Sequence, residues 1–211
     1  MAVLPIIKFP DKILRQRARK IRTIDRSINR LASDMIDTMN DADGVGLAAN
    51  QVGVLKRVIV VQLPEEEGAE PREELREEPR EEPRVYINPE IVYREGVRVV
   101  EEGCLSVPGF VGTVERSIWV KFRALNLESK TVRIKADSLL AQILEHEVDH
   151  LNGILYMDHL LEHEKLRPIE VESDSSDGDV QKTQHASGLH SHSGAEIIPS
   201  ELNEKSIRPI I

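Results

Sequence analysis

The feature that most constrains this chain is the sequence His-Glu-Val-Asp-His at residues 146–150, which lies inside an apolar segment. Two histidines four residues apart share one face of a helix, close enough to bind a single metal ion. A buried helix that carries such polar groups is stable only when they are paired or metal-bound. The surrounding apolar side chains recur at helical spacing and predict a helix over about Ser138–Asn152: Leu140, Ile143, Leu144, Val148 and Leu151.

The residues around this helix define its limits and suggest its chemistry. Asp137 or Ser138 can cap the start, and Gly153 can end the helix. Glu147 follows the first histidine directly, so its carboxylate would lie beside a metal-bound water and accept its proton. The alternative interpretation is a pair of surface histidines on an amphipathic helix, with no metal ion.

The third metal ligand is not part of this motif. One group of zinc proteases extends the motif to H-E-x-x-H-x-x-G-x-x-H, but Tyr156 occupies the last position here. His159 and His163 do not fit that spacing. The remaining candidate is Cys104, because a thiolate binds borderline-soft divalent cations well. The alternative for Cys104 is a small buried apolar residue, although the flanking Gly103 and polar neighbours favour a ligand.

A glycine- and alanine-rich segment at residues 44–53 is the third unusual feature. Its small side chains allow the backbone to approach a ligand or metal centre closely. Gln51 in this segment offers an amide donor for an oxyanion. Tight packing without a functional role is the alternative.

The rest of the pattern predicts an α+β fold, with antiparallel and mixed β-sheets packed around the central H-E-x-x-H helix. Apolar residues at helical spacing indicate an N-terminal helix over residues 25–40. Residues 127–130 form a plausible hairpin loop between the last two predicted strands. The β-branched and alternating segments predict strands over Arg57–Leu63, Val85–Tyr93, Val97–Val100, Ile118–Asn126 and Thr131–Ala136.

The net charge of −9 is concentrated in two segments. Residues 65–84 contain ten Glu and four Arg, and residues 169–211 contain eight acidic and three basic side chains, which leaves +2 for the remainder. We therefore expect a catalytic domain over residues 1–168 with a charged, mobile insertion at 64–84. A disordered acidic Ser/His-rich tail over 169–211 should follow.

The composition also limits where the protein works. Cys104 is the single cysteine, so no internal disulfide forms, and this fits a reducing cytosol. No apolar run approaches the roughly 20 residues of a membrane span, and the N-terminus lacks the pattern of a signal peptide. We expect a cytoplasmic protein without a membrane partner.

Three segments, in this order, closely resemble the signature motifs of peptide deformylase. They are Gly-Val-Gly-Leu-Ala-Ala-Asn-Gln at 44–51, Glu-Gly-Cys-Leu-Ser at 102–106 and His-Glu-Val-Asp-His-Leu-Asn-Gly at 146–153. The resemblance covers roughly residues 3–165. It implies hydrolysis of the formyl group from the N-terminal formylmethionine of nascent peptides. It also implies one divalent metal ion per chain, natively Fe(II), with Zn, Ni or Co as substitutes.

The resemblance also implies a role for each matching residue. Cys104, His146 and His150 would bind the metal, and Glu147 would act as the general base. The Gln51 side chain and the Leu105 backbone N–H would stabilise the oxyanion. Glu102 is expected to pair with Arg116 and brace the turn that carries Cys104. An apolar pocket for the methionine side chain would involve Val45, Gly46, Leu105, Leu139 and Ile143.

Two other functions compete with this interpretation. A metalloendopeptidase of the H-E-x-x-H type would cut internal peptide bonds, and a non-enzymatic relative would bind metal only. The resemblance allows transient ribosome association. Because the tail is acidic and repels RNA phosphates, we expect this association to be weak or independent of the tail, and we expect no direct nucleic-acid binding.

Overall fold

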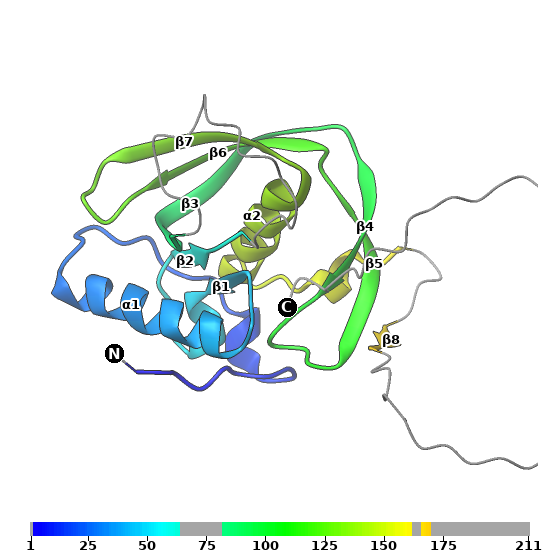
Figure 1. Ribbon diagram of the computed structural model, residues 1–211, viewed down its shortest axis with the longest axis horizontal. Coiled ribbons are helices and arrows are strands. Elements are labelled where there is room, and N and C mark those ends of the chain that lie inside the picture. Colours follow the sequence, from blue (N-terminus) through cyan, green and yellow to red (C-terminus); the bar gives the residue numbers. More distant parts are fainter. Residues whose placement is uncertain (1, 64–81, 162–165, 170–211) are drawn as a thin grey trace, which may run out of the picture. The chain divides into compact units, whose positions relative to one another are not determined.

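The computed structural model describes residues 2–63, 82–161 and 166–169, and these residues form an α+β fold with two antiparallel sheets (Figure 1). The larger sheet has the strand order β1-β2-β3-β6-β7, and the smaller sheet has the order β4-β5-β8. The helical elements are η1 (Lys12–Arg15), α1 (Arg26–Asp41), η2 (Ala49–Val52), α2 (Ser138–Leu151) and η3 (Tyr156–His159). The strands are β1 (Gly46–Ala48), β2 (Val58–Val61), β3 (Arg84–Glu95), β4 (Arg98–Gly103), β5 (Phe110–Arg116), β6 (Trp119–Leu125), β7 (Thr131–Asp137) and β8 (Arg167–Pro168).

The expected fold class and its main elements are confirmed. Both predicted helices are present, and each of the five predicted strands overlaps one of β2, β3, β4, β6 and β7. Pairing between the named strands is antiparallel throughout, and the parallel contact in the described residues is a single bridge between Arg19 and Lys56. The predictions for residues 64–81, for His163 and for residues 170–211 lie outside the described residues.

Three strands were not expected from the sequence. β5 contains Gly112 and ends in charged residues, so it lacks a β-branched run, yet it pairs with β4 along the length of that strand. β1 is only three residues long and lies within the glycine- and alanine-rich segment. β8 is a two-residue strand that pairs with the start of β5.

The α2 helix is buried from Ala141 to Leu151 and lies in the middle of the fold (Figure 1). Asp137 is the N-cap residue as predicted, but its side chain makes no capping hydrogen bond. Gly153 follows the end of the helix with φ +77°, and its N–H donates to the His150 carbonyl. A Cβ atom at Gly153 would lie 2.5 Å from the Arg15 carbonyl oxygen, so glycine is required there.

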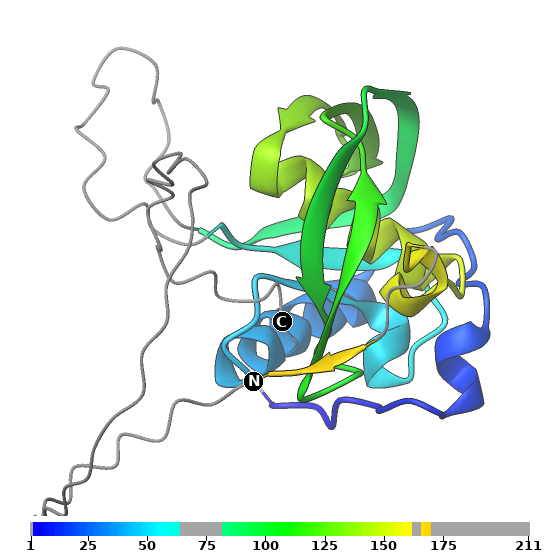
Figure 2. The ribbon, with the colours of Figure 1, turned by 90° about the vertical axis from the view of Figure 1, so that its right-hand side faces the viewer.

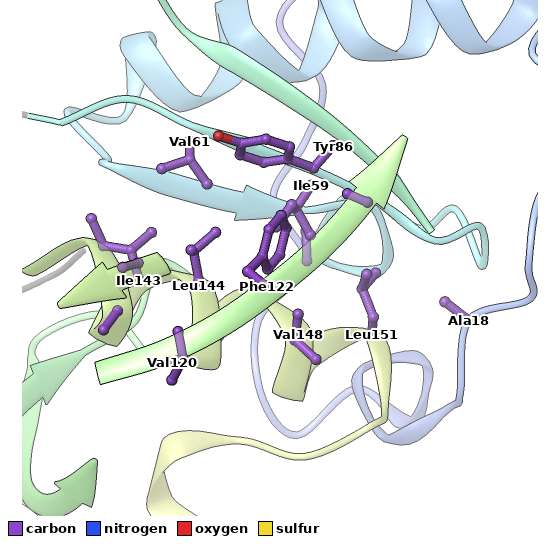
Figure 3. Close-up of a cluster of buried hydrophobic side chains, with 14 residues drawn as sticks. Ala18, Ile59, Val61, Tyr86, Val120, Phe122, Ile143, Leu144, Val148 and Leu151 are labelled. Carbon is purple, nitrogen blue, oxygen red and sulfur yellow. The ribbon is translucent and has the colours of Figure 1, made fainter. Parts of the chain in front are cut away.

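The β2 strand is apolar on both faces because helices cover both sides of the larger sheet at this point. Ile59 and Val61 belong to the cluster that packs against Leu144 and Val148 of α2 (Figure 3). On the opposite face, Val58 and Val60 join the cluster formed with α1, which contributes Ile28, Met35 and Met39. Figure 2 shows the β4–β5 hairpin crossing beside α2. Glu102 of β4 and Arg116 of β5 contact the helix there.

None of the helices in the described part of the chain combines the length and apolar character needed to cross a membrane.

Candidate active site

Two elements bring three potential metal ligands together. Cys104 directly follows β4, whereas His146 and His150 project from α2. Their ligand atoms lie within 4.8 Å of one another, and all three residues are buried. The His150 Nε2 atom lies 3.1 Å from both the Cys104 Sγ atom and the His146 Nε2 atom. The α2 helix supplies two of the potential metal ligands, and the turn after β4 supplies the third.

Buried ionic contacts orient the first histidine. His146 Nδ1 lies 3.0 Å from the Glu102 carboxylate, which leaves Nε2 facing the other two ligands. Arg116 donates two hydrogen bonds to Glu102, at 2.7 and 2.9 Å, and a third to Asp149 at 2.6 Å. Although burial raises the pKa of Glu102, the hydrogen bonds from His146 and Arg116 lower it to about 2. The contact predicted between Glu102 and Arg116 is therefore present.

The surroundings of His150 disfavour the charged form of its ring. Burial, followed by the effect of His146, keeps the pKa of His150 well below its ordinary value. Its ring is therefore neutral, which is the form that binds metal ions. His150 Nδ1 is buried and has no hydrogen-bond partner within the described part of the chain.

Glu147 lies on α2, directly after His146. Its side chain is buried, and its Oε2 atom has no hydrogen-bond partner in the residues that the structure describes. Burial raises the pKa of Glu147 to about 7. A carboxylate with that pKa can both accept and return a proton near neutral pH. Gly46 of β1 packs directly against it, since a Cβ atom there would lie 2.4 Å from Glu147 Oε1.

Gln51 reaches the same centre from η2. Its Oε1 atom accepts a hydrogen bond from the Ala48 N–H at 2.8 Å, so the amide orientation is fixed. Its Nε2 atom lies 3.2 Å from Ser106 Oγ and 3.6 Å from Cys104 Sγ. The glycine- and alanine-rich segment at residues 44–53 therefore contacts the turn that carries Cys104 through the Gln51 side chain.

The residues predicted for an apolar pocket do not all lie together. Val45, Leu139 and Ile143 pack in one core cluster, whereas Leu105 packs in the cluster next to α1. Gly46 lies beside Glu147 instead. The structure thus brings three of the five into one cluster, which is also the cluster that surrounds α2.

Several contacts of the site were missed at the sequence level. Lys8 donates a hydrogen bond to the Leu105 carbonyl at 2.6 Å, and Asn50 donates one to the His150 carbonyl. His159 Nε2 lies 2.9 Å from Asp149, at the outer end of the ionic network. These pairs are far apart in sequence except for the last one, so local patterning gives no signal for them. The contact between Gln51 and Ser106 was also missed. Its signal in the sequence was the position of Ser106 in the Glu-Gly-Cys-Leu-Ser segment.

Comparison with known proteins identifies the family. A model of the polypeptide deformylase family matches residues 3–166. The chain belongs to the peptide deformylase family. Peptide deformylases are metallohydrolases that remove the formyl group from N-terminal formylmethionine. The Cys104, His146 and His150 cluster in a member of this family supports one bound metal ion.

Individual peptide deformylases match over most of their length. The one from Dehalococcoides mccartyi (strain CBDB1) is 46% identical over 169 residues, which cover 80% of this chain and 93% of the relative. The one from Thermomicrobium roseum is 45% identical over 178 residues, which cover 83% of this chain and 96% of the relative.

Solved structures of peptide deformylases share the fold. The crystal structure from Legionella pneumophila has a TM-score of 0.65 and 42% identity, covering 76% of this chain and 87% of its own. The Ehrlichia chaffeensis peptide deformylase in complex with actinonin has a TM-score of 0.68 and 38% identity. The match covers 76% of this chain and 90% of the Ehrlichia chain. The Acinetobacter baumannii enzyme with Met-Ala-Ser bound has a TM-score of 0.66 and 38% identity. The match covers 75% of this chain and 99% of the Acinetobacter chain.

Proposed function

We propose that this chain removes the formyl group with one divalent metal ion held by Cys104, His146 and His150, and with Glu147 as the general base. One observation carries the proposal. A thiol and two imidazoles converge within 4.8 Å beside a buried carboxylate whose second oxygen has no partner among the described residues. These donors fit a borderline divalent cation. A metal ion held by these three residues would act as a Lewis acid towards the formyl group and would make water a stronger acid.

Glu147 performs the proton transfers in this proposal. Its carboxylate takes a proton from the attacking water while the water oxygen bonds to the formyl carbon. The same carboxyl then gives that proton to the departing amine, which leaves formate and a free N-terminus. Burial supports both steps, because a pKa of about 7 makes the two protonation states similar in free energy at neutral pH.

Gln51 and Leu105 stabilise the negative charge on the formyl oxygen. The Gln51 amide already has its oxygen engaged with the Ala48 N–H, so its Nε2 atom faces the Cys104 side of the site. The Lys8 contact to the Leu105 carbonyl holds the turn that presents the Leu105 backbone N–H. Donors fixed before the reaction lower the barrier because they need no reorganisation during it.

The methionine side chain of the substrate would bind near the start of α2. Val45, Leu139 and Ile143, which pack in one cluster, would form the apolar part of this subsite, and Gly46 and Leu105 would line its approach to the catalytic centre. An unbranched thioether fills an apolar site of this kind well. The Acinetobacter baumannii relative with Met-Ala-Ser bound supports a peptide of this class as the ligand.

The native metal is proposed to be Fe(II). One thiolate and two neutral imidazoles bind Fe(II), Zn, Ni and Co alike, so the protein itself selects weakly among them. Metal analysis of anaerobically purified protein measures this directly. Zinc as the main metal in such a sample would contradict the proposal.

We also propose that residues 1–168 form the catalytic domain of a cytoplasmic protein, with residues 64–84 as an insertion and 169–211 as a tail. The described residues 2–63, 82–161 and 166–169 support the extent of this domain, because they belong to one compact unit. Ribosome association, where it occurs, should not depend on the acidic tail. Deleting residues 169–211 is expected to leave salt-sensitive ribosome binding unchanged, and a marked weakening would contradict this.

The test of the proposed function is formate release from formyl-Met-Ala-Ser by anaerobically purified protein, with metal analysis of the same sample. Glu147→Gln should retain one metal ion per chain and lose turnover by about 10²–10⁴-fold. Glu115→Gln, an exposed change of the same chemistry on β5, is the matched control and should retain full turnover. Cys104→Ala should lose the metal, and full metal content in that variant would overturn the ligand set. Cleavage of unformylated internal peptide bonds at a similar rate would favour an endopeptidase.

A further inference from the structure

The outer face of β6 and β7 carries basic side chains directly opposite one another. The register pairs Lys121 with Lys135 and Arg123 with Arg133, and all four side chains are exposed. Like charges that face each other across a pair of strands are destabilising. The α1 helix packs on this face of the larger sheet at β1 and β2, while β6 and β7 lie at the other end of the strand order (Figure 1). This part of the sheet therefore presents a concentration of positive charge.

Two aromatic rings lie among these cations. The Tyr93 and Trp119 ring centroids are 5.3 Å apart, and 47% of Tyr93 is exposed. Lys135 Nζ lies 4.3 Å from the Trp119 centroid, and Lys121 Nζ lies 5.2 Å from the Tyr93 centroid. Partly exposed rings beside cations on one face of a sheet can bind both the bases and the phosphates of a nucleic acid.

The positive charge continues from this sheet face to a groove on the neighbouring loop. Glu90 of β3 accepts hydrogen bonds from both Arg123 and Lys20, so the two cations lie on either side of one carboxylate. Lys20 also lines a groove of about 650 Å³. The other basic side chains that line this groove are Arg19, Arg22 and Lys56, and the acidic one is Asp25.

We propose that this continuous surface, here called the basic track, binds single-stranded nucleic acid. The basic track consists of Lys121, Arg123, Arg133, Lys135, Lys20, Arg19, Arg22 and Lys56, with Tyr93 and Trp119 as stacking rings. The acidic side chains along it are Glu90, Glu95, Asp137 and Asp25, so it carries a net charge of +4 in a chain of −9. Phosphates neutralise the opposed cations of β6 and β7, and unstacked bases contact the rings.

A single strand fits this surface better than a duplex. The bases of a duplex are stacked on one another, so they are not available to Tyr93 and Trp119. The acidity of the tail led us to expect no direct nucleic-acid binding, but the negative charge of the chain lies mainly in residues 65–84 and 169–211. The basic track uses other residues, and the proposal does not depend on the hydrolytic function.

The test measures binding of fluorescein-labelled single-stranded 12-mers of RNA and of DNA to the full chain by anisotropy, from low to moderate salt. For the double variant Lys121→Gln/Lys135→Gln, we expect affinity at about 0.1 M salt to fall on the order of tenfold, with a shallower salt dependence. Trp119→Leu should weaken binding by about tenfold without changing the salt dependence, because it removes stacking rather than charge. Tighter binding of one of the two 12-mers identifies the biological source of the strand.

The matched control is the double variant Lys12→Gln/Arg30→Gln, which removes the same charge from exposed positions outside the basic track. It should change affinity by less than about twofold and keep the wild-type salt dependence. Thermal unfolding and deformylase turnover of each variant verify that it is folded. The proposal is overturned if the wild-type chain does not bind either 12-mer, or if both double variants lose affinity equally. It is also overturned if polyglutamate competes as well as unlabelled RNA, because the surface would then bind polyanions in general.

Discussion

At Gly46, the absence of a side chain makes room for the Glu147 carboxylate. A Cβ atom at this position would lie 2.4 Å from Glu147 Oε1 and 3.0 Å from its carboxyl carbon. The atom that would have to move is the end of a flexible side chain, so the fold can accommodate a methyl group there. The proposed base cannot keep its position at the same time.

We therefore predict that Gly46→Ala uncouples stability from turnover. The variant should fold and bind one metal ion per chain, while formate release falls by about 10²-fold because the proposed base is displaced. Metal analysis, thermal unfolding and formate release on one preparation measure the three quantities. Wild-type turnover in the folded variant would show that the exact position of Glu147 is unimportant.

At the level of elements, one buried guanidinium connects the smaller sheet to α2. Arg116 of β5 contacts Glu102 of β4 and Asp149 of α2, and its side chain is only 4% exposed. The two carboxylates raise the pKa of Arg116 despite its burial, so it stays cationic. Removing the cation would leave two buried carboxylates without their common partner.

Arg116→Ala is expected to destabilise the protein by about 3–5 kcal/mol, since an uncompensated buried charge is strongly unfavourable. Chemical denaturation at constant metal concentration measures the change. Arg123→Ala on β6 is the control, because that arginine is 53% exposed and its ion pair with Glu90 should contribute less than about 1 kcal/mol. Equal effects of the two substitutions would contradict a structural role for the buried network.

A second connection between elements predicts a pH dependence. Hydrogen bonds from Lys20 and Arg123 lower the pKa of Glu90 from 4.5 to about 2. A carboxyl whose pKa is lowered in the folded state stabilises the protein above its unfolded pKa, and this contribution disappears as the pH falls through the folded pKa. The contribution of Glu90 is therefore present above pH 4.5 and lost towards pH 2.

Glu90→Gln should be less stable than the wild type at neutral pH, by less than about 1 kcal/mol because solvent screens this partly exposed ion pair. The difference should shrink as the pH falls from 4.5 towards 2. Urea denaturation across this range measures it. Glu128→Gln in the exposed hairpin loop serves as control and should show little difference at any pH. A difference for Glu90→Gln that grows at low pH would contradict the assigned ion pairs.

For the molecule as a whole, the proposed metal links parts of the chain that are distant in sequence. Cys104 extends from the smaller sheet, while the two histidines lie on the helix that packs against the larger sheet. A ligand that binds the folded state only stabilises that state by mass action. The metal should therefore contribute to the stability of the whole fold as well as to catalysis.

Removing the metal with a chelator is expected to lower the thermal unfolding temperature and abolish formate release. A free metal concentration about 100-fold above Kd corresponds to about 2.7 kcal/mol of stabilisation. Adding Fe(II) or Co(II) should restore both properties, as measured by calorimetry and formate release. Cys104→Ala should be insensitive to the chelator. An unchanged unfolding temperature after complete metal removal would show that the site does not couple to the fold.

The chemistry of the site was largely predictable from the sequence, because its residues stand in short segments of unusual composition. The helix with His146 and His150 follows from apolar periodicity, and Cys104 follows as the single thiol in a polar, glycine-containing turn. The α1 helix and five strands follow from local pattern in the same way. The contact between Glu102 and Arg116 was predicted as a pair, and the structure contains it.

The remaining features depend on contacts between distant segments. Strand β5 forms because β4 pairs with it, although Gly112 interrupts its apolar pattern. Lys8 reaches the Leu105 carbonyl and Asn50 reaches the helix end only because the fold brings them there. The division of the predicted pocket, with Leu105 in a different cluster from Val45, also depends on tertiary packing.

The pairing of Val61 with Arg84 at the adjoining ends of β2 and β3 has a practical consequence. This pair already brings the end of β2 and the start of β3 together. The sequence between the two strands can therefore change length at little cost in loop-closure entropy, about 0.6 kcal/mol for each doubling. An affinity tag or a fluorescent reporter placed between these two strands should leave the catalytic centre intact. The position thus offers a way to follow the enzyme in living cells without attaching anything to either terminus.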